Sequence, residues 1–272
     1  MEEIASDKRF AGSIPELYET VLVPLIFAPY AEDLAQRLEG RPLASVLEIA
    51  AGTGAVTRRL ASTLPASVAI VATDLNPPMI EQARRVGTSR PVEWQPADAA
   101  SLPFPDATFD AVVCQFGAMF FPDKAIAFAQ ARRVLRPGGL FLFNVWDAIE
   151  TNEIPEVVMQ SLAATYPDDP PRFLARTPHG YHDRARIAAD LRAAGFTREA
   201  RFSTVQRQSV AASAAQAALA FCQGTPLRNE IEARDPAGLS RATDAVREAI
   251  AHRFGHGRVQ GRIQAIVVEV EH

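Results

Sequence analysis

The chain has 272 residues, of which 48% are hydrophobic and 22% are charged, and its formal net charge is −4. These values are ordinary for a globular protein with a large core, and the negative charge excludes a general electrostatic attraction to nucleic-acid phosphates. The length suits one large α/β domain with additions.

Neither the cysteines nor the hydropathy pattern indicates a secreted or membrane protein. Cys114 and Cys222 have no redox or metal-ligand spacing, so we predict no disulfide and no metal site. The apolar run 21–31 contains two prolines and is too short to cross a bilayer, and the acidic start is unlike a signal peptide. We therefore expect a cytoplasmic protein that does not contact a membrane.

The N-terminal part is expected to be helical. The pattern predicts a helix over residues 14–23 that Pro24 ends, because a proline inside a helix removes a hydrogen bond and clashes with the preceding turn. A second helix is predicted from 29 to 39, with Gly40 as its C-terminal stop.

A strand, a small-residue loop and a helix follow over residues 44–64. The apolar strand carries an acid, Glu48, and the loop contains Gly52 and Gly54, which allow positive φ and close approach of a ligand. The next helix points its unpaired N–H groups at the same place. This arrangement is typical of a nucleotide-type cofactor site.

Two cofactor classes compete for this loop. A dinucleotide fingerprint has a third glycine where this chain has Thr57, and Glu48 would repel a pyrophosphate. An acid there suits a cationic ligand such as S-adenosylmethionine (SAM), which carries a sulfonium and an ammonium group. The next strand ends at Asp74, which can accept ribose hydroxyls in either class.

Further strands alternate with helical patterns along the chain. After the strands at 44–50 and 67–73 we expect strands at 91–96, 109–115, 140–146, 196–206 and 262–270, with a turn at 136–139 and helices at 124–135, 152–165, 183–194, 210–222 and 239–254. The predicted fold class is α/β: a Rossmann-like, seven-stranded, doubly wound sheet, mostly parallel with strand seven antiparallel, and with helical cap insertions.

Four motifs in order resemble those of class I SAM-dependent methyltransferases, in particular the small-molecule branch that includes the ubiquinone/menaquinone-biosynthesis C-methyltransferases. They occupy residues 48–54, 74–79, 98–110 and 133–139. The resemblance implies SAM as the cofactor and S-adenosylhomocysteine as its product. The cofactor-binding residues that it implies are Glu48, Ala50, Gly52, Thr53, Gly54, Asp74, Leu75, Met79, Asp98, Ala99, Gln115, Phe116 and Gly117.

The same resemblance implies a division of the chain and a place for the acceptor. Residues 1–40 would form an N-terminal helical lid, and residues 41–272 the SAM-binding domain, with cap insertions at about 150–182 and 208–258. Tyr18, Phe27, Phe120 and Trp146 are candidates for the substrate pocket, although aromatic side chains that simply pack the core would give the same pattern. Tyr18, His179 and His182 are the candidate bases.

We therefore predict a methyltransferase that acts on O, N or C of a small, apolar or aromatic acceptor. A nicotinamide-dependent oxidoreductase and a SAM-binding protein without catalysis remain as alternatives. A nucleic-acid methyltransferase is disfavoured, because the Asn-Pro-Pro run at 76–78 follows strand two and not strand four. The expected partner is a small-molecule acceptor and not nucleic acid or membrane, and a homodimer is considered as the assembly. Arg172, Arg176 and Arg228 suggest an acceptor that carries a carboxylate or hydroxyl.

Overall fold

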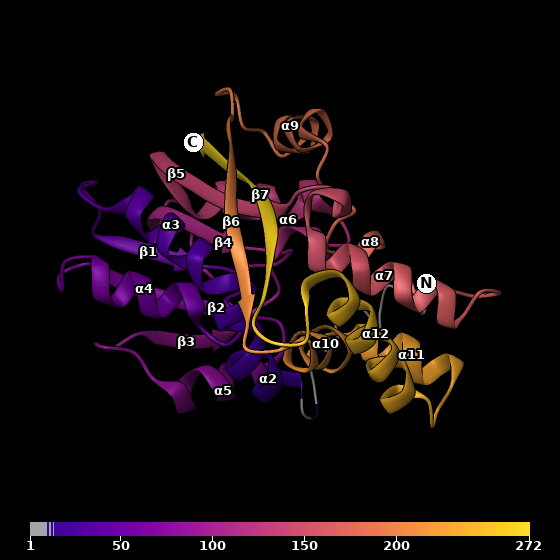
Figure 1. Cartoon of the computed structure of the whole chain (residues 1–272). Coiled ribbons are helices and arrows are strands. Elements are labelled where there is room, and N and C mark those ends of the chain that lie inside the picture. Colours follow the sequence, from indigo (N-terminus) through magenta and orange to yellow (C-terminus); the bar gives the residue numbers. More distant parts are fainter. Residues whose placement is uncertain (1–9, 11, 13) are drawn as a thin grey trace. The chain divides into compact units, whose positions relative to one another are not determined.

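The computed structural model describes residues 10, 12 and 14–272 (Figure 1). The rest of the predicted N-terminal lid before Ile14 lies outside the described residues. The chain divides into two compact units, which we treat separately. The sheet unit contains Ala28–Val145, Tyr181–Val205 and Ala265–His272, and the helical unit contains the residues up to Phe27, Trp146–Gly180 and Gln206–Gln264.

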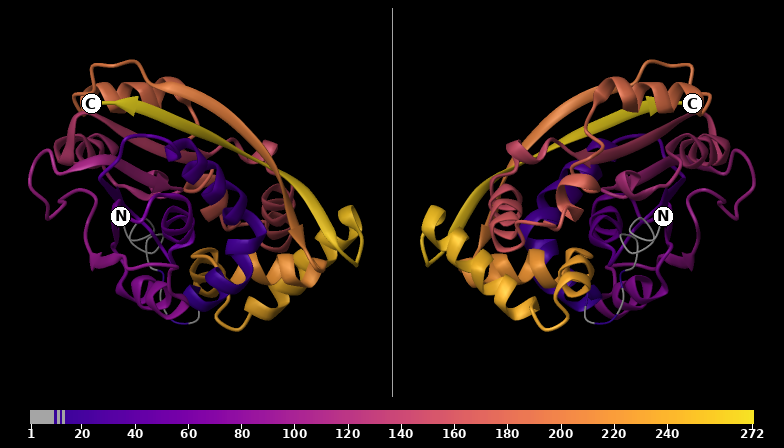
Figure 2. Two further views of the ribbon diagram at one scale, coloured as in Figure 1. Left: turned by 90° about the vertical axis from the view of Figure 1, so that its left-hand side faces the viewer. Right: turned by 90° about the vertical axis from the view of Figure 1, so that its right-hand side faces the viewer.

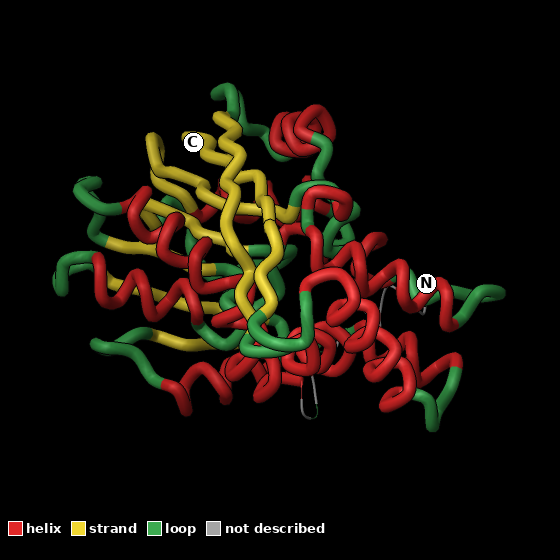
Figure 3. The backbone as a smooth tube through the Cα atoms, in the orientation of Figure 1, coloured by secondary structure: helices red, strands yellow, loops and turns green. Residues whose placement is uncertain are grey.

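Seven strands in the described part of the chain form one sheet, in the order β3-β2-β1-β4-β5-β7-β6. Figure 3 draws the strands in yellow. Strands β1 to β5 pair in parallel, and β7 is antiparallel. Next to the end of β7, His272 donates its N–H to the Gly139 carbonyl at 2.8 Å and accepts from the Gly138 N–H at 2.9 Å. The predicted fold class is therefore confirmed. The strands are β1 (Ser45–Glu48), β2 (Ala69–Asp74), β3 (Glu93–Pro96), β4 (Phe109–Gln115), β5 (Leu135–Trp146), β6 (Arg201–Ala211) and β7 (Val259–Glu271).

The register brings the polar ends of three strands to one edge of the sheet. Glu48 lies opposite Ala72 on β2 and Val113 on β4, so Glu48, Asp74 and Gln115 all lie at the carboxyl edge. The strand order reverses between β1 and β4. In open α/β sheets this switch point is where ligands bind.

Helices cover both faces of the sheet within the sheet unit. The right-handed crossover rule places α4 and α5 on one face and α6 on the other, because the order reverses between β1 and β4. Helix α3 packs with α4, and α6 packs with α9. The elements are α3 (Ala28–Leu38), α4 (Ala55–Thr63), α5 (Pro77–Val86), the 3₁₀ turn η2 (Ala118–Phe120), α6 (Lys124–Val134) and α9 (Arg184–Ala193).

The helical unit is built around α10. This alanine-rich helix packs on α12, α7, α11 and η1, and Figure 2 shows α10 to α12 together in orange to yellow. Its small side chains let neighbouring helices approach closely. The elements are α2 (Ile14–Leu17), the π-helical η1 (Tyr18–Phe27), η3 (Ile149–Thr151), α7 (Glu153–Thr165), α8 (Phe173–Arg176), α10 (Ala214–Gln223), α11 (Leu227–Arg234) and α12 (Leu239–Phe254). Among the described helices, none is long and apolar enough to cross a membrane.

Three expected boundaries were wrong. Pro24 does not end a helix but lies inside η1, whose wider π-helical turn tolerates a residue without an N–H. The predicted turn at 136–139 belongs to β5, where a bulge lets Phe109 pair with Leu135 and Ala111 pair with Leu140. Strand β6 begins at Arg201 and continues to Ala211, so the predicted helix at 210–222 starts later, after the Ser213 side chain caps it.

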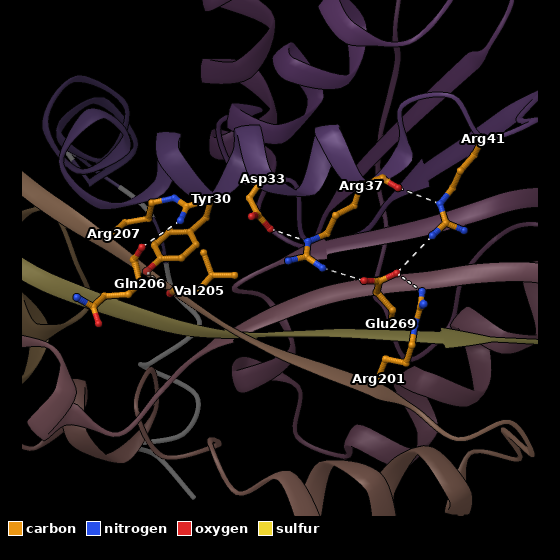
Figure 4. A network of polar contacts seen from close by, with 9 residues as sticks. All are labelled: Tyr30, Asp33, Arg37, Arg41, Arg201, Val205, Gln206, Arg207 and Glu269. Atoms are coloured by element: carbon orange, nitrogen blue, oxygen red, sulfur yellow. Dashed lines mark hydrogen bonds and ion pairs between the residues drawn. The ribbon is translucent and has the colours of Figure 1, made fainter.

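One carboxylate on β7 joins α3 to β6. Glu269 accepts from Arg37 at 2.8 Å, from Arg41 at 3.3 Å and from Arg201 at 2.7 Å (Figure 4). The Glu269 side chain is only 11% exposed. Three cations around one shielded carboxylate form a network, and such networks stabilise more than an isolated surface pair.

We predict that Glu269→Gln lowers the free energy of unfolding by about 1–3 kcal/mol, since three guanidinium groups lose their shared counter-charge. Urea denaturation of both proteins measures the difference. Glu248→Gln is the matched control, because Glu248 is 62% exposed and pairs only at the surface with Arg247. The role given to Glu269 is wrong if both substitutions cost the same.

Candidate functional site

Glu48 ends β1 as a fully buried carboxylate, 1% exposed. Its Oε2 accepts a hydrogen bond of 2.5 Å from the Thr57 hydroxyl on α4. Burial raises the pKa of Glu48 to about 8, although the Thr57 bond and the nearby Arg58 lower it. Thr57 occupies the position of the third glycine in a dinucleotide fingerprint. The residue that departs from that fingerprint therefore also fixes the Glu48 carboxylate.

Asp74, at the end of β2, fixes the glycine loop from the neighbouring strand. Its Oδ2 accepts from the Gly52 N–H at 2.8 Å, and its Oδ1 accepts from the Asn76 N–H at 2.8 Å. Burial raises the pKa of Asp74, and the bonds from Asn76 and Gly52 oppose this shift. Asp74 therefore shapes the loop in addition to its predicted contact with a ribose.

The glycine loop has a backbone that few residues tolerate. Ala50, Gly52 and Gly54 have φ of 54°, 57° and 84°. A Cβ at Gly54 would lie 2.7 Å from the Trp94 ring, so this position also lacks space for a side chain. The close approach expected from the sequence is thus matched by the geometry.

The turn after β4 has a similar backbone. Phe116 has φ of 51°, and its N–H donates to the Asn144 Oδ1 at 2.9 Å. A Cβ at Gly117 would overlap the Cβ of Ala50 and lie 2.8 Å from the Cys114 sulfur. The β4 turn and the glycine loop are therefore in direct contact.

The remaining predicted cofactor residues lie beyond β2 and β3. Leu75 is half exposed, and Met79 is buried at the start of α5. Asp98 is exposed and accepts from the Ala100 N–H at 2.8 Å, and Ala99 is buried. One Asp98 oxygen is therefore used in a hydrogen bond within the loop that follows β3.

Two buried polar atoms near the loop fit a polar ligand. The Thr53 hydroxyl and the Gln115 Oε1 have no hydrogen-bond partner among the described residues. Buried polar groups are nearly always paired in proteins, so unpaired ones at a ligand edge deserve an explanation. The chemistry of Glu48, Asp74, Thr53 and Gln115 matches a cofactor with cationic and hydroxyl groups.

Four further predicted residues come together in the helical unit. Tyr18 stacks on Phe27 with ring centroids 4.8 Å apart, and Phe27 lies 6.1 Å from Trp146. The ring of His179 lies 5.9 Å from that of Trp146. The His179 Nδ1 is 2.8 Å from the Asp147 carbonyl, which can only accept, so Nδ1 carries the proton and Nε2 has the lone pair.

Other candidates are not part of this cluster. Phe120 ends η2 in the sheet unit, and His182 is exposed in the same unit, next to the N-cap of α9. The Tyr181 hydroxyl donates to Asp190 at 2.6 Å, and burial raises the pKa of Tyr181, so we assign it a structural role.

Two of the three cap arginines pair with acids within the helical unit. Arg176 pairs with the buried Glu230 at 2.7 Å, and Arg228 pairs with Glu232 at 2.8 Å. These pairs weaken the inference of an acceptor carboxylate. The sequence analysis also missed Asn144, although a lone amide in the apolar run 140–146 is a signal for a buried hydrogen bond.

Comparisons with known proteins find methyltransferases similar to this chain. A family model described as a methyltransferase domain matches residues 47–143. The ubiquinone/menaquinone biosynthesis C-methyltransferase UbiE of Escherichia coli is 32% identical over 168 residues, covering 56% of this chain and 66% of that protein. The predicted resemblance to class I SAM-dependent methyltransferases is thereby confirmed. The alignment spans slightly less than two thirds of the length of UbiE.

Solved structures of methyltransferases and related proteins have a similar fold. The YcgJ protein of Bacillus subtilis is 20% identical with a TM-score of 0.56, covering 89% of this chain and 98% of that chain. A phosphoethanolamine N-methyltransferase of Haemonchus contortus, solved with S-adenosylhomocysteine, is 16% identical with a TM-score of 0.56, covering 94% of this chain and 56% of that chain. At these identities the likeness shows the fold.

The raised pKa of Glu48 predicts how stability of the methyltransferase domain depends on pH. An acid whose pKa rises from about 4.5 to about 8 on folding favours the folded state at low pH, and this contribution is lost as the pH rises through 8. Relative to wild type, Glu48→Gln should therefore become more stable between pH 5 and pH 9, by about 2–4 kcal/mol. Urea denaturation at each pH measures this, and a difference that does not change with pH contradicts it.

Proposed function

We propose that the protein transfers the methyl group of SAM to O, N or C of a small, apolar or aromatic acceptor. The observation that carries the proposal is the pair of buried carboxylates, Glu48 and Asp74, on either side of the glycine loop. An ionised Glu48 would repel a pyrophosphate, whereas a sulfonium and an ammonium group would compensate for the burial of its charge.

Each residue at the carboxyl edge has a proposed role. Glu48 provides the counter-charge for the cationic end of the cofactor, and Asp74 accepts its ribose hydroxyls. Asp98, Ala99, Leu75 and Met79 surround the adenine. Ala50, Gly52 and Gly54 allow close approach of the backbone, and Thr53, Gln115, Phe116 and Gly117 contact the amino-acid end.

When bound, SAM supplies a methyl group activated by a sulfonium, with a thioether as the leaving group. The chain then has to hold and align the acceptor, and alignment of two reactants removes roughly 7–11 kcal/mol of barrier. Tyr18, Phe27 and Trp146, all in the helical unit, offer aromatic faces for a planar acceptor. Phe120, in the sheet unit, stays a separate prediction. UbiE is named as a C-methyltransferase, which supports carbon as one acceptor atom.

His179 is the proposed base. Its Nδ1–H is held by the Asp147 carbonyl, which orients the ring and makes Nε2 the basic nitrogen. The turn that carries it is tight, because a Cβ at Gly180 would overlap the Arg176 carbonyl. An acceptor hydroxyl would lose its proton to Nε2 as its oxygen takes the methyl group.

The cofactor assignment predicts micromolar binding of S-adenosylhomocysteine by calorimetry, and no binding of NADH. Asp74→Asn keeps an acceptor for only one of the Gly52 and Asn76 N–H groups and loses the charge that strengthens bonds from the ribose hydroxyls, so we expect affinity to fall about 10- to 100-fold. Asp106→Asn is the control, because Asp106 is 77% exposed and pairs with Arg133 outside the site. Binding of NADH in place of S-adenosylhomocysteine would overturn the assignment.

The base assignment predicts different effects for two histidines. With methyl-labelled SAM and an acceptor found in a panel of phenols and quinols, His179→Gln should lower kcat about 10²–10⁴-fold. His182→Gln should leave kcat unchanged, because His182 is exposed. Equal activity of both variants would remove His179 from the reaction, and no turnover at all with intact binding would favour a SAM-binding protein without catalysis.

A further inference from the structure

Asn144 is a fully buried amide in an otherwise apolar stretch of β5. Burying an amide costs free energy unless its polar atoms are bonded. The Asn144 Oδ1 accepts the Phe116 N–H at 2.9 Å, and the Asn144 backbone carbonyl accepts the same N–H at 3.2 Å. One residue of β5 therefore holds a single N–H of the β4 turn twice.

The bonded N–H belongs to a strained residue. Phe116 has φ of 51°, a region that bulky side chains rarely adopt and that persists only where the surroundings enforce it. The Phe116 ring packs edge-on against Tyr30 at 5.3 Å, which adds a second constraint. The next residue, Gly117, lies against Ala50, so the Asn144 bonds to the Phe116 N–H act next to the contact between the β4 turn and the glycine loop.

The amide nitrogen of Asn144 makes no hydrogen bond within the described part of the chain. Its Nδ2 has no partner among the described residues, and the same is true of the Gln115 Oε1. Gln115 and Asn144 are register partners on neighbouring parallel strands, so their side chains lie on the same face of the sheet. An unpaired donor thus lies beside an unpaired acceptor.

We propose that Asn144 is a positioning residue for cofactor binding. It keeps Phe116 in the left-handed conformation, so that the amino-acid end of the cofactor meets a preformed turn, and its Nδ2 steadies the Gln115 amide oxygen in the bound state. The inference rests on the proposed function, because it assumes that S-adenosylhomocysteine binds at this edge.

The test is calorimetry with S-adenosylhomocysteine on wild type and two variants. Asn144→Leu has a similar volume but no side-chain acceptor, so the Phe116 N–H keeps only the longer bond to the backbone carbonyl of residue 144, and affinity should fall at least 10-fold. Asn144→Asp keeps the side-chain acceptor but loses the Nδ2 donor beside Gln115, so its affinity should lie between those of wild type and Asn144→Leu. Asn152→Leu is the control. Asn152 is also fully buried and bonded to backbone, but it is not one of the proposed cofactor residues. The affinity of this variant for S-adenosylhomocysteine should stay within twofold of wild type.

A double substitution separates positioning from general damage. Glycine adopts positive φ without help, so in a Phe116→Gly background Asn144→Leu should weaken binding less than threefold. A wild type that does not bind would refute the proposed function. If the wild type binds, two results would refute the role of Asn144. One is an affinity of Asn144→Leu within twofold of wild type, and the other is an equal loss of affinity from Asn144→Leu in the wild-type and Phe116→Gly backgrounds.

Discussion

The structure at the carboxyl edge of the sheet depends on the burial of two carboxylates at the ends of neighbouring strands. Glu48 and Asp74 are both buried, and the charge of Asp74 is one of the causes that raise the pKa of Glu48. Each acid is bonded to a group that fixes the loop: Thr57 for Glu48, and the Gly52 N–H for Asp74. The same bonds that make burial tolerable therefore set the shape of the glycine loop.

The loop in turn constrains its neighbours. Ala50 and Phe116 both have positive φ, and there is no space for a side chain at Gly117 between them. Strain at such positions is typical of functional sites, where the surroundings fix a geometry that the sequence alone would not favour. Asn144 on β5 and Thr73 on β2, whose carbonyl accepts the Ala51 N–H at 2.9 Å, supply those surroundings from outside the loop.

Much of the sheet unit could be predicted from the sequence, because local patterns determine it. Apolar runs ending in Glu48 and Asp74, prolines at the start of α5 and Asp123 at the N-cap of α6 are short-range signals. The errors lie where distant contacts decide. Pro24 sits within a helix, and β5 continues through Pro137 and Gly138 because a bulge and the pairing with His272 accommodate them.

The candidate site follows the same division. The glycine loop and both acids could be read from the sequence, because the motif is contiguous. The partners of Arg176 and the contacts of Asn144 join residues 54 and 28 positions apart, and no local pattern encodes them. The grouping of Tyr18, Phe27, Trp146 and His179 likewise needs three separate chain segments.

The most direct test of the account is the number of protons released when S-adenosylhomocysteine binds. A Glu48 with a pKa of about 8 is mostly protonated at pH 7, and an ammonium group bound beside it should drive ionisation. Calorimetry in buffers of different ionisation enthalpy should then show release of up to about one proton for wild type and none for Glu48→Gln. Binding without proton release, or the same release from both proteins, would contradict the role of Glu48 as the counter-charge of the cofactor.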